Sequence, residues 1–210
     1  MSLGITIGPL ARWTRDGDNE LAETVRNHME RINSLLVANR LPPHGEPENL
    51  PRLRTRCRLD HMPYSWHARL PRAIAFSRQG PKDYAPAGQD DDPLSHEYVR
   101  TELRLKKSHV ICQGAEGYYV PIDFHYPITV GVPPKLGGRM VGSSQAASRE
   151  LVAVAPLLGI RLGKGKLSNA VAANIDKEEG GAYYEERQAW LILFESFRLS
   201  IELKACVCFH

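Results

Sequence analysis

The sequence has few cysteines, no long apolar run and no strong excess of charge of one sign. Its 4 cysteines among 210 residues are too few for the disulfide framework of a small secreted domain. No apolar run approaches the about 18 residues of a membrane-spanning helix. The first residues, Met1 to Ile7, lack the basic segment and apolar stretch of a secretory signal. We therefore expect a cytoplasmic protein of bacterial type with no membrane segment.

The sequence also lacks the motifs that mark common catalytic centres. Gly-x-Ser-x-Gly, His-Glu-x-x-His and Gly-x-Gly-x-x-Gly are all absent. The run Gly163-Lys164-Gly165-Lys166 does not have the spacing of a phosphate-binding loop. A net charge of +3 is too small to require a nucleic-acid or membrane partner. These observations predict no cofactor and no bound metal, and they do not indicate nucleic-acid binding.

The composition is that of an ordinary globular protein, with 42% hydrophobic and 24% charged residues. A chain of this length can bury about 70% of its unfolded surface without disulfides or metals. We expect a single domain over residues 1–210, with loop-rich segments near 41–51 and 79–93. The second of these segments is rich in glycine, proline and aspartate, which favours a surface loop.

Three helices are predicted from the apolar periodicity. The first begins after Asp18 and ends near Asn39 or Arg40, before two consecutive prolines. The second is capped by Ser143 or Ser144 and ends before Gly159. The third spans residues 182–203 and is apolar over more than half of its circumference, which is typical of a central, buried helix.

The strand signals lie in four other segments. His109 to Cys112 and Tyr118 to Phe124 are rich in β-branched and aromatic residues and flank a glycine-bearing turn, which predicts a hairpin. Residues 52–59 alternate between arginine and other residues, and residues 206–209 form a short apolar end. We predict an α+β fold in which the long C-terminal helix packs on a small, mainly antiparallel sheet of these segments.

Three side chains of the predicted hairpin are candidates for catalysis. Alternation along the second strand projects Asp123 and His125 to the same side, and Glu116 lies in the preceding turn. A carboxylate beside an imidazole can orient the ring and make it a general base. The alternative is that all three are solvated polar groups on an exposed face.

The four arginines at alternate positions, Arg52, Arg54, Arg56 and Arg58, are the candidate binding residues. On a strand they would share one face, where their charges would repel unless acidic groups lay opposite. Those groups could be the protein's own carboxylates, an acidic partner or phosphates. No aromatic residue alternates with the arginines, so the stacking expected of a single-strand nucleic-acid surface is missing.

Two groups of residues contain side chains that can bind a metal. His44 lies between Glu46 and Glu48, but in a proline-rich connector that would preorganise ligands poorly. Potential zinc ligands also occur in the predicted hairpin and the terminal strand: His109, Cys112, Cys206, Cys208 and His210. Neither half of this set forms the Cys-x-x-Cys pair of a zinc ribbon.

Glu195 is a charged residue inside the most apolar helix. Burial alone would raise its pKa, which would mark an acid–base residue. Alternatively, Glu195 pairs with Arg198, three residues further along the same helix face.

The run Gly117-Tyr118-Tyr119-Val120-Pro121-Ile122-Asp123-Phe124 resembles a stretch shared by a family of uncharacterised bacterial proteins. The run Gly142-Ser143-Ser144, followed by a helix that ends at Leu158-Gly159-Ile160, is similar to the same family. The resemblance covers a small part of the chain and implies no activity.

The sequence therefore favours a non-catalytic interaction or regulatory protein, for instance one that neutralises a toxin. Its contact surface would be the arginine face and the 79–93 loop, and its partner an acidic protein. The alternative is a small hydrolase-like enzyme that uses Glu116, Asp123 and His125.

Overall fold

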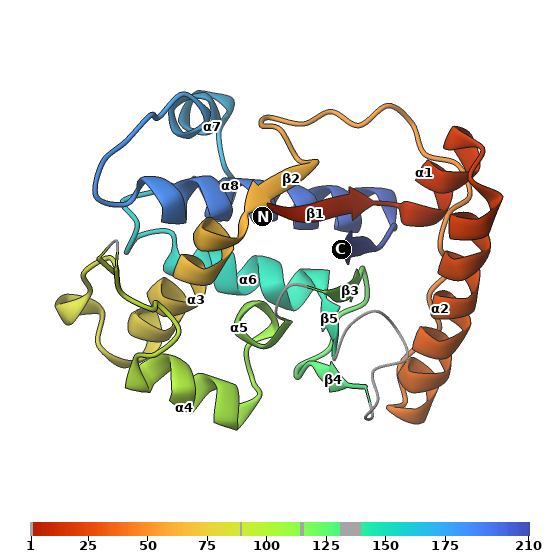
Figure 1. Ribbon diagram of the computed structural model, residues 1–210, viewed down its shortest axis with the longest axis horizontal. Coiled ribbons are helices and arrows are strands. Elements are labelled where there is room, and N and C mark those ends of the chain that lie inside the picture. Colours follow the sequence, from red (N-terminus) through yellow and green to blue (C-terminus); the bar gives the residue numbers. More distant parts are fainter. Residues whose placement is uncertain (1, 89, 114–115, 131–139) are drawn as a thin grey trace.

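The computed structural model describes residues 2–88, 90–113, 116–130 and 140–210 (Figure 1). The helices are α1 Pro9–Asp16, α2 Asn19–Ala38, α3 Tyr64–Gln79, the short 3-10 helix η1 Pro81–Asp83, α4 Glu97–Leu105, α5 His109–Gln113, α6 Ser144–Val154, α7 Asn169–Asp176 and α8 Tyr184–Leu203. The strands are β1 Ser2–Ile7, β2 His61–Pro63, β3 Gly117–Val120, β4 Ile128–Thr129, β5 Met140–Ser143 and β6 Val207–Phe209. None of the described helices is long and apolar enough to cross a bilayer.

The strands form one sheet in the order β2-β1-β6-β3-β5-β4. Neighbouring strands are antiparallel except β3 and β5, which are parallel. The predicted α+β class with a mainly antiparallel sheet is thus confirmed. The C-terminal strand β6 lies between β1 and β3, so both ends of the chain meet in the middle of the sheet (Figure 1).

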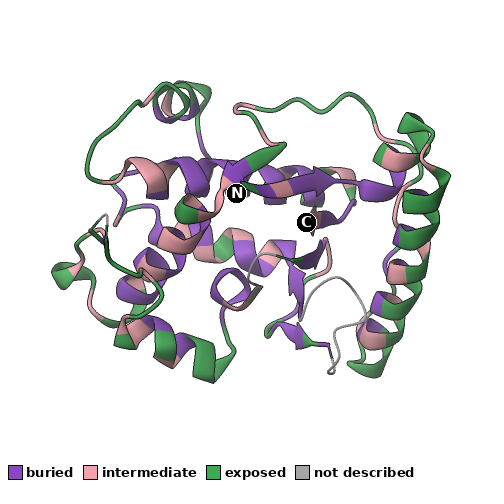
Figure 2. Ribbon diagram, viewed as in Figure 1, coloured by how far each residue is buried: buried purple, intermediate pink, exposed green. Residues whose placement is uncertain are grey.

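Helices cover both faces of the sheet. On one face, β1, β6 and Tyr119 of β3 pack into a core with α3, α6 and α8. On the other, Tyr118 and Val120 of β3 pack with Cys206 and the apolar stripe of α2. Successive side chains of β3 thus pack into two different cores. The sequence predicted one apolar face and one polar face for this strand. The buried positions concentrate in α8 and the central strands, while the outer face of α2 is exposed (Figure 2).

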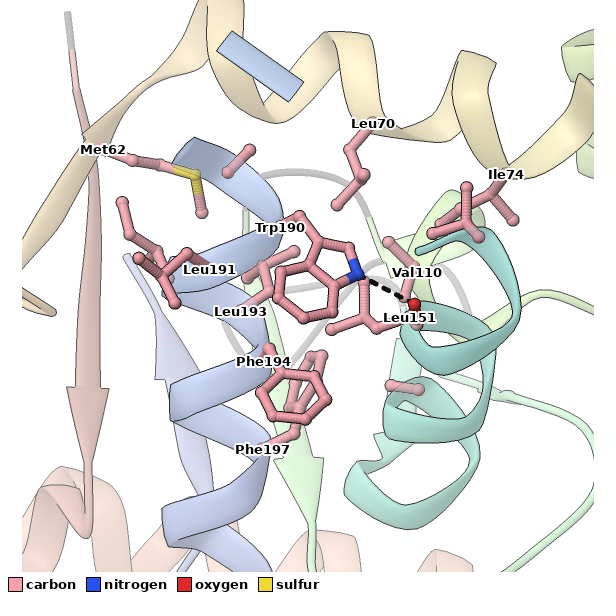
Figure 3. Close-up of a cluster of buried hydrophobic side chains, with 14 of the residues drawn as sticks. Met62, Leu70, Ile74, Val110, Leu151, Trp190, Leu191, Leu193, Phe194 and Phe197 are labelled. Atoms are coloured by element: carbon pink, nitrogen blue, oxygen red, sulfur yellow. Dashed lines mark hydrogen bonds between the residues drawn. The ribbon is translucent and has the colours of Figure 1, made fainter. Parts of the chain in front are cut away.

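Helix α8 is packed on several sides. Trp190 is fully buried, and its indole N–H donates to the Leu151 carbonyl of α6 at 2.8 Å (Figure 3). Phe194 stacks on Trp190 with 4.6 Å between ring centroids. The helix lies inside the range predicted from periodicity, residues 182–203.

The predicted hairpin is wrong, because residues 109–113 form helix α5 and the second strand, β3, ends at Val120 instead of Phe124. Asp123 and His125 therefore lie beyond the strand. The Glu150 carboxylate of α6 accepts from the backbone N–H groups of His109 at 2.7 Å and Val110 at 3.3 Å. Ser108 Oγ accepts from the Ile111 N–H at 3.0 Å. These bonds satisfy the free N–H groups of a helix start. A carboxylate distant in sequence thus outweighs the local β propensity.

The predicted arginine strand is also wrong, since residues 52–59 form no regular strand. The guanidinium of Arg56 turns inward to Glu195 of α8, while Arg58 turns to Asp60 two residues away, at 2.8 Å. In a paired strand, Arg56 and Arg58 would point to the same side. Here they bind carboxylates in different places, so this segment does not have the backbone of a strand. The sheet edge is instead formed by β2, which pairs with β1.

Gly142 of β5 lies opposite Tyr119 of β3, and a Cβ at this position would come within less than 3.0 Å of the tyrosine ring. The ring cannot move away easily, because it is fully buried and its hydroxyl donates to the His109 carbonyl at 2.9 Å. We expect Gly142→Ala to lower the free energy of unfolding by about 1–3 kcal/mol. Urea denaturation would measure this, with Gly163→Ala, where a Cβ meets nothing within 4 Å, as the control. Equal losses in both variants would contradict the prediction.

Candidate protein-binding surface

Two acidic segments lie at the same end of the molecule (Figure 1). Residues 83–97 connect η1 to α4 and hold five carboxylates and no lysine or arginine. Residues 176–186 connect α7 to α8 and hold five carboxylates and one lysine. We call these two segments together the acidic end. It contrasts with the whole chain, whose net charge is +3.

Aromatic and polar contacts join the two segments. Tyr84 stacks on Tyr183 with 5.9 Å between ring centroids and 19° between planes. The Tyr84 hydroxyl donates to the Glu186 carboxylate at 3.2 Å. Burial, followed by the nearby Glu186 charge, raises the pKa of Tyr84, so this hydroxyl keeps its proton. The acidic end is therefore one surface rather than two independent loops.

The cations nearest to the 83–97 segment bind its backbone. Arg69 of α3 donates to the Ala87 carbonyl, and Arg72 donates to the Ala85 carbonyl at 3.3 Å. Arg69 also pairs with Glu185 of α8. These bonds hold the path of the loop and leave its carboxylates without neutralisation.

Asp91 and Asp92 of this loop bind backbone N–H groups close to them in the sequence. Asp91 accepts from the Gly88 N–H at 2.8 Å, and Asp92 accepts from the Leu94 N–H at 3.0 Å. Both bonds are turn interactions between a side chain and the nearby backbone. They orient two carboxylates while leaving the negative charges in place.

Seven carboxylates of the acidic end are exposed and form no ion pair with any described residue: Asp83, Asp90, Asp91, Asp92, Glu97, Asp176 and Glu179. Of the remaining three, Glu178 pairs with Arg187 at 2.7 Å, Glu185 with Arg69, and Glu186 is buried against Tyr84. Uncompensated charge of one sign on one surface attracts a partner of the opposite sign. The sequence had indicated the 79–93 loop as a contact segment, but nothing in it showed that residues 176–186 lie alongside.

Two of the predicted catalytic residues, Asp123 and His125, interact electrostatically, but the main partner of Asp123 is Arg149. Asp123 is bound by both terminal nitrogens of Arg149, at 2.6 and 3.0 Å, and this bond lowers the pKa of its carboxyl. A carboxylate held in this way is a weak base. The exposed His125 ring packs against Tyr126, with 4.4 Å between centroids. Glu116 is exposed just before β3. Joint action of these three as a catalytic group stays a prediction.

The four candidate arginines do not form one face. Arg56 and Arg58 are paired with Glu195 and Asp60 respectively. Arg52 and Arg54 are exposed, and their side chains form no ion pair in the described part of the chain. Arg54 lines an open pocket beside Arg198 and Lys166. A binding role for this set also stays a prediction.

The potential zinc ligands from the hairpin and the terminal strand have different partners. His109 Nδ1 accepts from the Ser143 N–H at 2.9 Å, and His210 Nε2 lies 3.0 Å from the Thr6 hydroxyl. Cys112 lies in α5, and the Cys208 thiol lies 3.8 Å from the Phe209 carbonyl. Cys206 instead lies near Glu46, whose carboxylate accepts from the Cys206 N–H at 2.8 Å.

Residues 1–209 match the family model described as "Putative DNA-mimic protein". No curated protein and no solved structure matches the chain. The match indicates a protein-interaction or regulatory role. It also overturns the expectation of an acidic partner, because a surface that imitates DNA binds proteins with basic DNA-contacting surfaces.

Proposed function

The chain belongs to this DNA-mimic family, and from that premise we propose that its acidic end binds the DNA-contacting surface of a basic protein. The observation that carries the proposal is the set of seven exposed carboxylates without ion pairs among the described residues. DNA presents a dense array of negative phosphates to lysine and arginine side chains. Carboxylates on a folded surface can occupy the same cationic sites.

The net positive charge of the chain means that only part of its surface can imitate DNA. A net charge of +3 would repel a basic protein if it were spread evenly over the surface. Because the acidic end concentrates negative charge, the rest of the chain carries net positive charge, so approach through the acidic end is the orientation that electrostatic attraction favours. The complex is therefore expected to form through the end that holds Tyr84 and Tyr183.

One kind of basic DNA-binding protein that could be the partner is a toxin that acts on DNA. Neutralisation of such a toxin is the narrower form of the same proposal. A transcription regulator with a basic DNA-binding surface is a second partner of the same chemistry, and competition with DNA is common to both.

Affinity capture on immobilised protein, with duplex DNA as the competitor, tests the proposal. We expect the captured proteins to bind DNA and to be released by a short duplex. The variant Asp90→Asn/Asp91→Asn/Asp92→Asn keeps the side-chain oxygens that accept turn bonds while removing three charges. We expect this variant to bind the captured protein at least about tenfold more weakly, with a smaller dependence on salt.

The matched control removes three charges at the opposite end of the molecule. Glu20→Gln/Glu23→Gln/Glu30→Gln changes the exposed face of α2 by the same net charge. We expect this control to bind as the unmodified chain does. Binding that survives both duplex DNA and the loop substitutions would exclude DNA mimicry by the acidic end.

A further inference from the structure

A buried cluster of three different ligand types lies far from the acidic end in the sequence. Between α2 and β2 the chain runs through a proline-rich connector, and its His44 and Glu46 side chains are only 5% and 2% exposed. Cys206, directly before β6, is fully buried beside them. The connector thus places an imidazole and a carboxylate beside the core that α2 and Cys206 share on one face of the sheet.

The three groups are close enough to share one ion. His44 Nε2 lies 2.6 Å from one Glu46 carboxylate oxygen, and that oxygen also accepts from the Cys206 N–H at 2.8 Å. One ligand atom from each of the three residues lies within 4.8 Å of the others. The other Glu46 oxygen, Oε1, is buried and has no hydrogen-bond partner in the described part of the chain. An unpartnered buried carboxylate oxygen is costly unless something binds it.

We propose that His44, Glu46 and Cys206 bind a divalent transition-metal ion of the zinc class. Sulfur, imidazole nitrogen and carboxylate oxygen are the ligands that zinc takes in proteins, at about 2.0–2.3 Å. Calcium and magnesium prefer oxygen ligands alone, so this donor set disfavours them. A metal at this point gives a partner to Glu46 Oε1, which none of the described residues binds by a hydrogen bond.

The surroundings hold the ligands in place. Asn33 of α2 binds the backbone of His44 in both directions, accepting from its N–H at 2.7 Å and donating to its carbonyl at 2.9 Å. The Cys206 backbone is fixed by its bond to Glu46 and by its position at the start of a central strand. Fixed backbones on two distant segments are what a preorganised site requires. The bound metal would fasten the connector to the sheet.

Cobalt(II) spectroscopy on the full chain tests this site. The chelator-treated chain is titrated with Co²⁺, and we expect a saturable absorption band from thiolate-to-cobalt charge transfer at one equivalent, displaced by Zn²⁺. Cys206→Ser should remove that band. Cys57→Ser, at a half-buried cysteine outside the cluster, should leave it unchanged. Glu46→Gln keeps the side-chain volume and should weaken Co²⁺ binding at least about tenfold.

Circular dichroism of each variant shows whether it folds, and Glu46→Gln keeps the test valid if Cys206→Ser does not. Absence of a thiolate band in the unmodified chain would overturn the proposal. A band that persists in folded Cys206→Ser, or Co²⁺ affinity that is unchanged in folded Glu46→Gln, would also overturn it. The measurement is independent of the acidic end, so its failure leaves the proposed function untouched.

Discussion

Glu195→Ala is expected to lower the free energy of unfolding by about 3–5 kcal/mol. Glu195 is 0% exposed in the middle of α8, and its carboxylate binds two guanidinium groups. Arg56 reaches it from the connector and is only 19% exposed, while Arg198 binds both carboxylate oxygens at 3.0 and 3.1 Å. Removal of the carboxylate leaves these cations without their anionic partner and opens a cavity.

Burial alone would raise the pKa of Glu195, but hydrogen bonds from Arg198 and Arg56 outweigh it and lower the pKa. A carboxyl whose pKa is lower in the folded state stabilises the fold above its unfolded pKa. That contribution is lost as the pH falls through the folded pKa. Glu195 is therefore a structural ion-pair residue, as one of the two sequence interpretations predicted. In acid, the difference between the unmodified chain and Glu195→Gln should shrink.

Glu202→Ala is the matched control on the same helix. Glu202 also pairs with Arg198, at 2.6 Å, but it is 62% exposed. An exposed pair contributes about 0–1 kcal/mol, so this loss should be small. Urea denaturation of both variants gives the comparison. Similar free energies for Glu195→Ala and Glu202→Ala would contradict the role of burial in this network.

The helices that the sequence predicted correctly have long apolar periodicity and local caps. Asp18 accepts from the Leu21 N–H at 3.0 Å at the start of α2, and Ser143 accepts from the Ala146 N–H at 3.1 Å at the start of α6. Both caps and both apolar stripes can be seen within about twenty residues of sequence. Such elements depend little on distant contacts.

Two wrong predictions, the strand at residues 109–112 and the arginine strand, share one cause, a carboxylate contributed from far away in the sequence. Glu150 caps the start of α5 and is 41 residues from His109 in the sequence. Glu195 binds the guanidinium of Arg56, which is 139 residues away in the sequence.

The candidate surfaces differ in the same way. The 79–93 loop could be recognised from its composition, but its partner segment at 176–186 could not, because the contacts of Tyr84 with Tyr183 and Glu186 join residues about a hundred positions apart in the sequence. The closeness of His44, Glu46 and Cys206 could not be predicted for a related reason. A proline-rich connector was expected to leave its ligands mobile, whereas Asn33 and the Cys206 backbone fix them.

Acidification from pH 6.5 to pH 4.5 is expected to remove about 2 kcal/mol of stability for each of two buried histidines, His67 and His109. Burial lowers the pKa of both rings to about 4. Protonation of His109 would also place a donor against the Ser143 N–H, which now donates to Nδ1 at 2.9 Å. The neutral ring is thus built into the junction between β5 and α6.

The direction of the effect follows from proton uptake. Below about pH 6.5 the unfolded chain binds a proton at each histidine, while the folded chain stays neutral at these sites until about pH 4. The unfolded state therefore binds more protons in this window, and stability falls as the pH falls. The contribution of each ring is fully present above pH 6.5.

Urea denaturation at several pH values between 4.5 and 7 measures the slope. His67→Leu and His109→Asn should each reduce it by up to about 1.4 kcal/mol per pH unit, whatever their stability at pH 7. Asparagine keeps an oxygen that can accept from the Ser143 N–H. Gly163→Ala, which changes no titratable group, should leave the slope unchanged. If the slopes of all three variants matched that of the unmodified chain, the acid sensitivity of the fold would have to lie in other groups.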